Sequence, residues 1–162
     1  MENLWAPWRM RYIENSEEEN GCIFCEKPGE ENDRNNLILY RGEYGFIIMN
    51  KYPYNNGHLL IVPYRHTNAF DSLDEKEVLC LHKLLKLGHK ALTEALNPHG
   101  FNVGLNLGRT AGAGIDQHLH YHIVPRWDGD TNFMPVIGKV KVISQAMEET
   151  YDRLFNILNG KK

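Results

Sequence analysis

Histidines stand at every second position of the segment His118–His122, and this alternation constrains the fold more than any other feature of the chain. Successive side chains of a β-strand point to opposite faces, so three alternating imidazoles share one face. Leu119, Tyr121 and Ile123 then share the other face and point into the core. A row of imidazoles packs poorly but binds metals and transfers protons well. The segment therefore predicts a strand that carries a functional site.

Two kinds of chemistry fit such a cluster. Imidazoles bind transition metals, so all three histidines could form one metal site. Alternatively, one imidazole can attack a phosphoryl centre and form a covalent intermediate. His120 is the candidate nucleophile because it has a histidine two residues away on both sides. Its second ring nitrogen then needs a partner that fixes the tautomer.

Size and charge narrow the class of protein. The chain has 162 residues, enough for one domain with a sizeable core, and a formal net charge of −3. This charge argues against a general nucleic-acid binder, which would show a basic excess. No apolar run is long enough to span a bilayer, and no basic leader precedes an apolar stretch at the N-terminus. We therefore expect a cytoplasmic protein that binds neither nucleic acid nor membrane.

The pattern of elements predicts an α+β fold. Runs rich in β-branched and aromatic residues predict strands at 37–40, 44–49, 58–62, 101–107 and 119–124. The strands cluster instead of alternating with helices, and their short connections favour antiparallel pairing. We expect a five-stranded antiparallel sheet with one long helix and a C-terminal helix.

Two helices have recognisable ends. Ser72 and Glu75 match a capping box at the start of the long helix, and 97–100 end it. The predicted apolar face of this helix consists of Val78, Leu81, Leu85, Leu92 and Leu96. The C-terminal helix is predicted to be capped by Ser144 and to end at Gly160. Its predicted apolar face consists of Met147, Tyr151, Leu154 and Leu158.

The chain resembles the histidine triad family of nucleotide hydrolases and transferases. His118–Val124 fits the family pattern His-x-His-x-His-x-x, with apolar or aromatic x, at every position. Upstream, Asn50 stands eight residues before His58, and Gly57–Pro63 fits the family's second signature. The resemblance spans about Cys22 to Arg126, most of the domain, and implies the fold of this family.

The resemblance also implies a domain organisation. Residues 1–162 would form a single histidine triad (HIT) domain, with 1–20 as an N-terminal arm, 22–126 as the core and 127–162 as a C-terminal extension that contains a helix. The flanks Leu4–Arg9 and Arg126–Met134 are similar to a bacterial branch that includes diadenosine tetraphosphate phosphorylases and hydrolases. A homodimer, paired through a helix and neighbouring strands, is implied as well.

Catalytic roles follow from the resemblance by position. His120 would be the nucleophile that takes the nucleoside monophosphate, and His122 would contact the phosphate or the leaving group. His58 would hydrogen-bond within the triad and help to orient it, and His118 is the first histidine of the triad.

Nucleotide contacts follow in the same way. Asn50 would hold the ribose hydroxyls, and Asn106 would contact the phosphate or the leaving side. Ordinary turn chemistry accounts equally for both asparagines without the resemblance. Ile23 and Phe24 are candidates for the wall of an adenine pocket, with ordinary core packing as the alternative.

A glycine-rich loop, 108–114, precedes the triad and can present backbone N–H groups to anionic oxygens. Many family members carry a hydroxyl residue just before the triad that helps the leaving group, but this chain has Gly114-Ile115-Asp116 there. We therefore expect phosphate contacts from Gly112, Gly114 and Gln117. This departure puts phosphoramidate substrates in doubt and favours dinucleoside polyphosphates.

Cys22 and Cys25 have the spacing of metal ligands but form only half a site. Zinc-containing family members complete it with a histidine at the position of His66 and with the first triad histidine, here His118. The resemblance thus implies a structural, tetrahedral Zn²⁺ site with these four ligands. A redox pair and two buried cysteines without a metal are the alternatives.

Together these features predict cleavage of dinucleoside polyphosphates through a covalent nucleotidyl-histidine at His120, with adenine as the expected base. Water and phosphate are both open as the acceptor. The alternatives are a hydrolase of nucleoside phosphoramidates and a non-catalytic nucleotide-binding or zinc-stabilised interaction protein.

Overall fold

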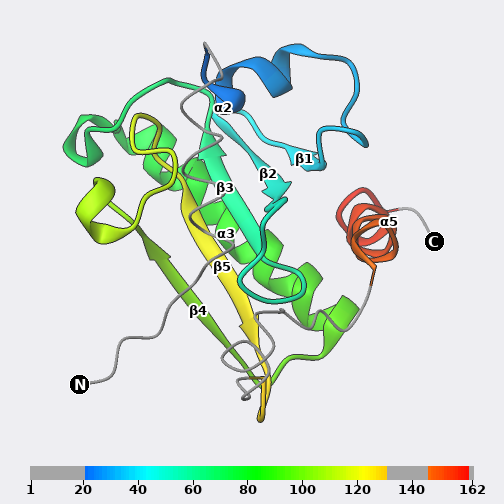
Figure 1. Cartoon of the computed structure of the whole chain (residues 1–162). Helices are drawn as coiled ribbons and strands as arrows, with labels where there is room; N and C mark the ends of the chain where they lie inside the picture. The colour runs from blue at the N-terminus through cyan, green and yellow to red at the C-terminus, as the bar shows by residue number, and fades with distance from the viewer. Residues whose placement is uncertain (1–20, 131–145, 161–162) are drawn as a thin grey trace, which may run out of the picture.

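The computed structural model describes residues 21–130 and 146–160, and it contains a mixed α+β fold (Figure 1). Its strands are β1 (Ile38–Arg41), β2 (Gly45–Met49), β3 (Leu59–Pro63), β4 (Gly100–Leu105) and β5 (Tyr121–Arg126). Its α-helices are α2 (Ile23–Glu26), α3 (Glu75–Leu96) and α5 (Met147–Leu158). Short 3-10 helices lie at Lys27–Gly29, Phe70–Ser72 and Arg109–Ala111.

The five strands form one sheet in the order β1-β2-β3-β5-β4, and every neighbouring pair is antiparallel. This confirms the predicted fold class. The predicted strands differ from the observed ones by at most two residues at each end. One cause is the positive φ of Leu37, 60°, so that β1 begins only after it.

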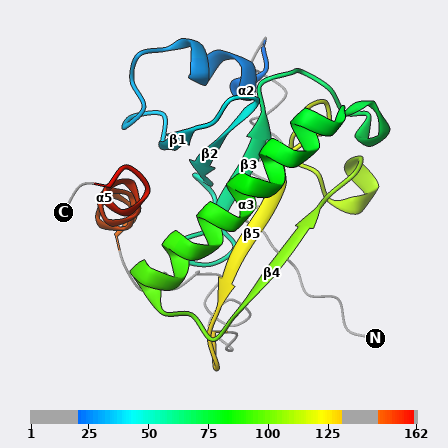
Figure 2. The same ribbon diagram turned by 180° about the vertical axis from the view of Figure 1, so that it is seen from behind.

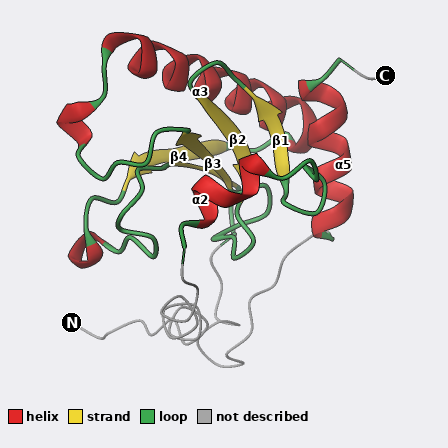
Figure 3. Ribbon diagram, turned by 90° about the horizontal axis from the view of Figure 1, so that it is seen from above, coloured by secondary structure: helices red, strands yellow, loops and turns green. Residues whose placement is uncertain are grey.

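Alternation along the central strands separates two apolar layers. Ile47 and Met49 of β2 pack with the buried face of α3 and with α5, whereas Phe46 and Ile48 pack with Phe24 of α2. Figure 2 shows α3 lying across one face of the sheet, and Figure 3 shows α2 on the opposite face. All five residues of β2 are therefore buried.

The start of α3 differs from the prediction. Asp74 is the N-cap, and its carboxylate accepts the N–H of Glu77, whose own carboxylate accepts the N–H of Asp74. Ser72 instead lies in a 3-10 turn, where its hydroxyl donates to the carbonyl of Ala69. The capping-box pattern occurs twice, two residues apart, and the second match begins the helix.

The apolar face of α3 is confirmed only in part. Leu81 and Leu92 are buried, and Leu85 and Leu96 are half-buried. The prediction that Val78 belongs to the buried face is wrong, since this residue is 48% exposed. Besides the N-terminal Glu77, four buried positions were not predicted, and they are small or lie one residue earlier than the predicted leucine: Leu84, Gly88, Ala91 and Ala95.

The helix α5 packs against α3 and β1, as the predicted apolar face requires. Tyr151, Leu154 and Leu158 are buried, and the Tyr151 hydroxyl donates to the carbonyl of Ile38 at 2.9 Å. Ala146 is its N-cap and has no side-chain hydrogen bond. The predicted cap Ser144 and the predicted arm 1–20 lie outside the described residues.

Gly57, just before β3, has a φ of +72° and is tightly enclosed. A Cβ at this position would lie 2.5 Å from Leu96 Cδ1 and 3.0 Å from Leu92 Cδ2. We expect Gly57→Ala to lower the free energy of unfolding by roughly 2–4 kcal/mol, because it adds backbone strain to overpacking. Urea denaturation measures this change.

Gly104→Ala is the matched control, because no atom lies within 4 Å of the Cβ position of Gly104. It should change the free energy of unfolding by less than about 0.5 kcal/mol. Equal effects of the two substitutions would contradict the close packing described for Gly57.

Among the helices of the described ranges, none is both long and apolar enough to cross a lipid bilayer.

Candidate active site and metal site

The predicted histidines converge where β3 and β5 lie side by side. His122 is in β5, paired with Leu60, whereas His58 directly precedes β3. The sequence predicted that all three alternating histidines lie in the strand, but β5 begins only at Tyr121. The segment before it leaves the sheet because the N–H of Leu119 donates to the carbonyl of Thr67 at 2.7 Å. His118 and His120 are therefore in irregular backbone.

His120 is held as the tautomer that a nucleophile needs. Its Nδ1 lies 2.8 Å from the carbonyl oxygen of His118. A carbonyl only accepts, so Nδ1 carries the hydrogen and Nε2 keeps its lone pair. Burial lowers the pKa of His120 below its usual value, against the opposing effect of this hydrogen bond, and so favours the neutral ring. The ring of His120 can therefore attack through Nε2.

His58 and His122 form a hydrogen-bonded pair next to His120. The N–H of Tyr54 donates to His58 Nδ1 at 3.0 Å, so the hydrogen of His58 is on Nε2. His58 Nε2 lies 2.9 Å from His122 Nδ1, which therefore accepts. A neutral His122 then carries its hydrogen on Nε2. The ring centroids of His120 and His122 are 4.9 Å apart, so the hydrogen-bonded pair lies next to the His120 ring.

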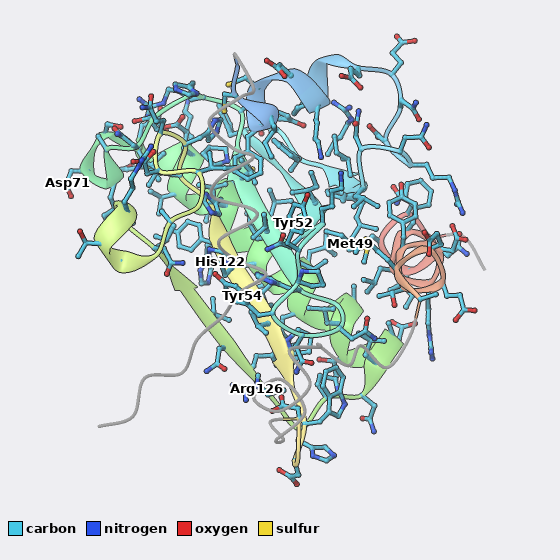
Figure 4. The ribbon with its side chains drawn as sticks, in the orientation of Figure 1. Met49, Tyr52, Tyr54, Asp71, His122 and Arg126 are labelled. Atoms are coloured by element: carbon cyan, nitrogen blue, oxygen red, sulfur yellow. The ribbon has the colours of Figure 1, made fainter. Side chains whose placement is uncertain are left out.

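Tyr54 is a site residue that sequence reasoning missed. Its ring stacks on His122 at 5.7 Å and lies 4.7 Å from the ring of His58, and Figure 4 shows Tyr54 and His122 side by side. The only signal in the sequence is its place between Asn50 and His58. Asn55 and Asp130, which connect this loop to the end of β5, were also missed.

Asn50 contacts the histidines directly. Its amide nitrogen lies 3.3 Å from His58 Nδ1, and its side-chain oxygen accepts the N–H of Tyr52 at 2.9 Å. The second contact is the turn chemistry that was the alternative for this residue. A small pocket beside Asn50 is lined by Met49, Asn50, Pro53, Asn56, Gly57, His58 and Met147. The role of Asn50 toward ribose stays a prediction.

The glycine-rich loop is held mainly by its own backbone. Gly108 and Gly112 have φ values of 80° and 95°, and the N–H groups of 111–113 donate to carbonyls within the loop. The side chain of Asn106 donates to the carbonyl of Gly112 at 3.5 Å. Arg109 and Asp116 close the loop with an ion pair of 3.0 Å. The N–H groups that we predicted for phosphate are thus partly engaged, and contacts from Gly112, Gly114 and Gln117 stay predictions.

Phe24 belongs both to the core and to the wall of the site. It is 2% exposed, and its ring lies 5.1 Å from that of His120 and 5.5 Å from that of His118. Ile23 is half-buried at the edge of the same apolar layer. Phe24 thus packs in the core, and its ring also covers the candidate nucleophile, whereas the role of Ile23 and Phe24 toward adenine stays a prediction.

The four predicted metal ligands meet near the end of β3 and the start of β5, beside α2. Their ligand atoms all lie within 4.8 Å of one another. Cys22 Sγ is 3.2 Å from His118 Nδ1, and Cys25 Sγ is 3.3 Å from His66 Nδ1. In a tetrahedral zinc site, sulfur and nitrogen ligands lie about 3.5 Å apart. The donor set therefore fits such an ion in both chemistry and spacing.

His118 presents the correct nitrogen to this cluster. Its Nε2 lies 2.9 Å from the carbonyl oxygen of Pro63, so the hydrogen is on Nε2 and the Nδ1 lone pair faces the cysteines. Its side chain is 1% exposed, and burial lowers its pKa to about 4. A neutral histidine with a hydrogen-bonded second nitrogen is the usual form of a metal ligand.

Comparison with known proteins agrees with this geometry. Residues 31–129 match the HIT domain. The chain is 39% identical to an AP-4-A phosphorylase of Mycobacterium tuberculosis over 158 residues, which cover 93% of this chain and 80% of the relative.

Solved structures show the same fold. A histidine triad nucleotide-binding protein of Sulfolobus tokodaii aligns with a TM-score of 0.63 at 29% identity, over 86% of this chain and 91% of that chain. A zinc-bound histidine triad family protein of Mycobacterium smegmatis aligns with a TM-score of 0.68 at 24% identity, over 86% of this chain and 94% of that chain. By its sequence match, its histidine geometry and its fold, the chain belongs to the HIT domain family.

Proposed function

We propose that this protein cleaves dinucleoside polyphosphates, with diadenosine tetraphosphate as the model substrate, through a covalent intermediate on His120. The observation that carries the proposal is the hydrogen bond from His120 Nδ1 to the carbonyl of His118, which leaves Nε2 as a buried nucleophile. The AP-4-A phosphorylase of M. tuberculosis, similar over most of the chain, supports the choice of substrate.

The proposed reaction has two steps. His120 Nε2 attacks the α-phosphorus, the bond to the bridging oxygen breaks, and a nucleoside polyphosphate leaves with the electron pair. Water or phosphate then attacks the same phosphorus, releases His120 and yields a nucleoside mono- or diphosphate. Two inversions at phosphorus give net retention of configuration.

The histidine pair suits a leaving group that is a weak base. His122, with its hydrogen on Nε2, can donate a hydrogen bond to the departing oxygen, and the Nε2–H of His58 supports it by donating to His122 Nδ1. A terminal phosphate has a second pKa of about 6, so it leaves near neutral pH without full protonation. An amine needs a full proton. Since the chain has Gly114-Ile115-Asp116 where many family members carry a hydroxyl residue that helps the leaving group, we favour polyphosphates over phosphoramidates.

We also propose that Cys22, Cys25, His66 and His118 bind one structural Zn²⁺. The donor set and its spacing support this, as does the zinc-bound relative of M. smegmatis. Such an ion supplies a cross-link between α2 and the segment before β5, with no part in bond cleavage. A homodimer is a further proposal, supported by exposed apolar side chains on the edge strand β4 (Val103) and on α3 (Val78 and Leu79).

Product analysis of diadenosine tetraphosphate, with and without inorganic phosphate, tests the proposed function. ADP plus ATP formed only with phosphate means a phosphorylase, and AMP plus ATP formed without it means a hydrolase. Adenosine 5′-phosphoramidate is the comparison substrate, and we expect it to react at least about 10-fold more slowly. Faster cleavage of the phosphoramidate would overturn the choice of substrate, and binding without cleavage of either would indicate a non-catalytic protein.

A further inference from the structure

The side chain of Asn55 fastens the loop that carries His58 to the end of β5. Its amide nitrogen donates to the carbonyl of Pro125 at 3.1 Å and to Asp130 Oδ2 at 2.8 Å. Its own backbone carbonyl accepts the N–H of His58 at 3.2 Å. Asn55 therefore connects the loop before His58 with the end of β5, the strand that carries His122.

Asp130 is itself rigidly held. Arg126, at the end of β5, donates to both of its carboxylate oxygens, at 2.6 and 2.8 Å, and the N–H of Trp127 donates at 3.1 Å. A further nitrogen of Arg126 donates to Asn102 Oδ1 in β4 at 2.7 Å. The Asp130 side chain is only 8% exposed, so this network presents a fixed acceptor to Asn55. Arg126 lies at the far end of β5 from the site (Figure 4).

We propose that Asn55, Asp130 and Arg126 form a positioning clamp for the active site. The clamp fixes the loop 53–58 against β5 and thereby keeps His58 Nε2 at 2.9 Å from His122 Nδ1. None of the three residues touches the reacting atoms in this arrangement. The expected effect of the clamp on turnover rests on the proposed function. Its effect on the geometry of the His58–His122 pair does not.

Loss of the clamp is expected to change catalysis more than binding. The loop then moves relative to β5, and a displacement of about 1 Å at a catalytic group can cost on the order of 100-fold in rate. For Asn55→Ala we expect kcat to fall about 10- to 100-fold while KM changes less than about 3-fold. Asp130→Asn keeps the size of the side chain and should lower kcat in the same direction.

Glu77→Gln is the matched control. The Arg65–Glu77 ion pair has side-chain exposures of 43% and 8%, and the Arg126–Asp130 pair has 42% and 8%. Glu77 lies at the start of α3, away from the loop 53–58. Glu77→Gln should lower Tm about as much as Asp130→Asn does, but it should leave kcat within about 2-fold of that of the unaltered protein.

Nitrogen-15 NMR of the histidine side chains provides a readout that needs no substrate. In the unaltered protein, His58 should give the signals of a neutral ring with hydrogen on Nε2, with that hydrogen protected from exchange by His122. Asn55→Ala should remove this protection, and Glu77→Gln should retain it. Retained protection in Asn55→Ala and in Asp130→Asn would overturn the clamp, as would lost protection together with an unchanged kcat.

These outcomes separate the clamp from the proposed function. If the unaltered protein cleaves no nucleotide, the proposed function fails, and the exchange of the His58 hydrogen alone decides the clamp. If the unaltered protein is active and Glu77→Gln lowers kcat as much as Asn55→Ala, a general loss of stability explains both, and the clamp is overturned.

Discussion

His120→Asn is expected to lower kcat for diadenosine tetraphosphate by at least about 1,000-fold while nucleotide binding changes only a few-fold. An asparagine amide can still donate to the carbonyl of His118, as His120 Nδ1 does, so the local backbone keeps its partner. What the substitution removes is the Nε2 lone pair. Without it, no covalent intermediate forms.

Two measurements check this result. Steady-state kinetics give kcat, and rapid quenching with labelled substrate shows whether label becomes attached to the protein by an acid-labile, alkali-stable bond, as expected of a phosphorus–nitrogen bond. His82→Asn, an exposed position on α3, is the matched control and should behave as the unaltered protein. Substantial turnover by His120→Asn, or label retained on it, would place the nucleophile elsewhere.

Cys22→Ser is expected to abolish tight zinc binding and to lower Tm by roughly 6–12 °C. A structural zinc contributes several kcal/mol to folding, and for a chain of this size each kcal/mol corresponds to about 2–4 °C. The lost cross-link joins the start of α2 to His118. These segments are far apart in the sequence, but Cys22 Sγ lies 3.2 Å from His118 Nδ1. Chelation of the unaltered protein should give a similar decrease in Tm.

Elemental analysis and thermal unfolding measure the two effects. Cys80→Ser is the matched control: Cys80 is half-buried on α3 and accepts the N–H of Tyr44, a contact that serine can replace. It should retain one zinc per chain. A purified protein that contains no zinc and does not bind it on titration would contradict the metal site, and a disulfide between Cys22 and Cys25 would favour the redox alternative.

The sheet and the positions of the site residues were predictable from the sequence, because both depend on local patterns. β-branched runs bounded by turn residues placed the five strands, and residue spacing selected His120 and His122, whereas His58 was named through the family resemblance. The zinc ligands are distant in sequence, and they could be named only through the family resemblance. In the structure these four side chains do come together.

The missed features depend on backbone atoms that no sequence pattern marks. The tautomers of His118, His120 and His58 are set by the carbonyls of 63 and 118 and by the N–H of Tyr54. The late start of β5 follows from the hydrogen bond between Leu119 and Thr67, which only the tertiary fold creates. The true cap of α3, Asp74, competed with an equally good match at Ser72.

Residue 118 would serve the proposed metal site and the proposed nucleophile with different atoms. Its imidazole faces the cysteines, whereas its main-chain oxygen receives the hydrogen of His120. A peptide oxygen is present whatever side chain the residue has. During evolution, a descendant of this chain can therefore exchange the metal for ordinary packing at residue 118 without losing the group that selects the reactive nitrogen. Metal dependence and catalytic chemistry can be inherited as separate traits on this scaffold.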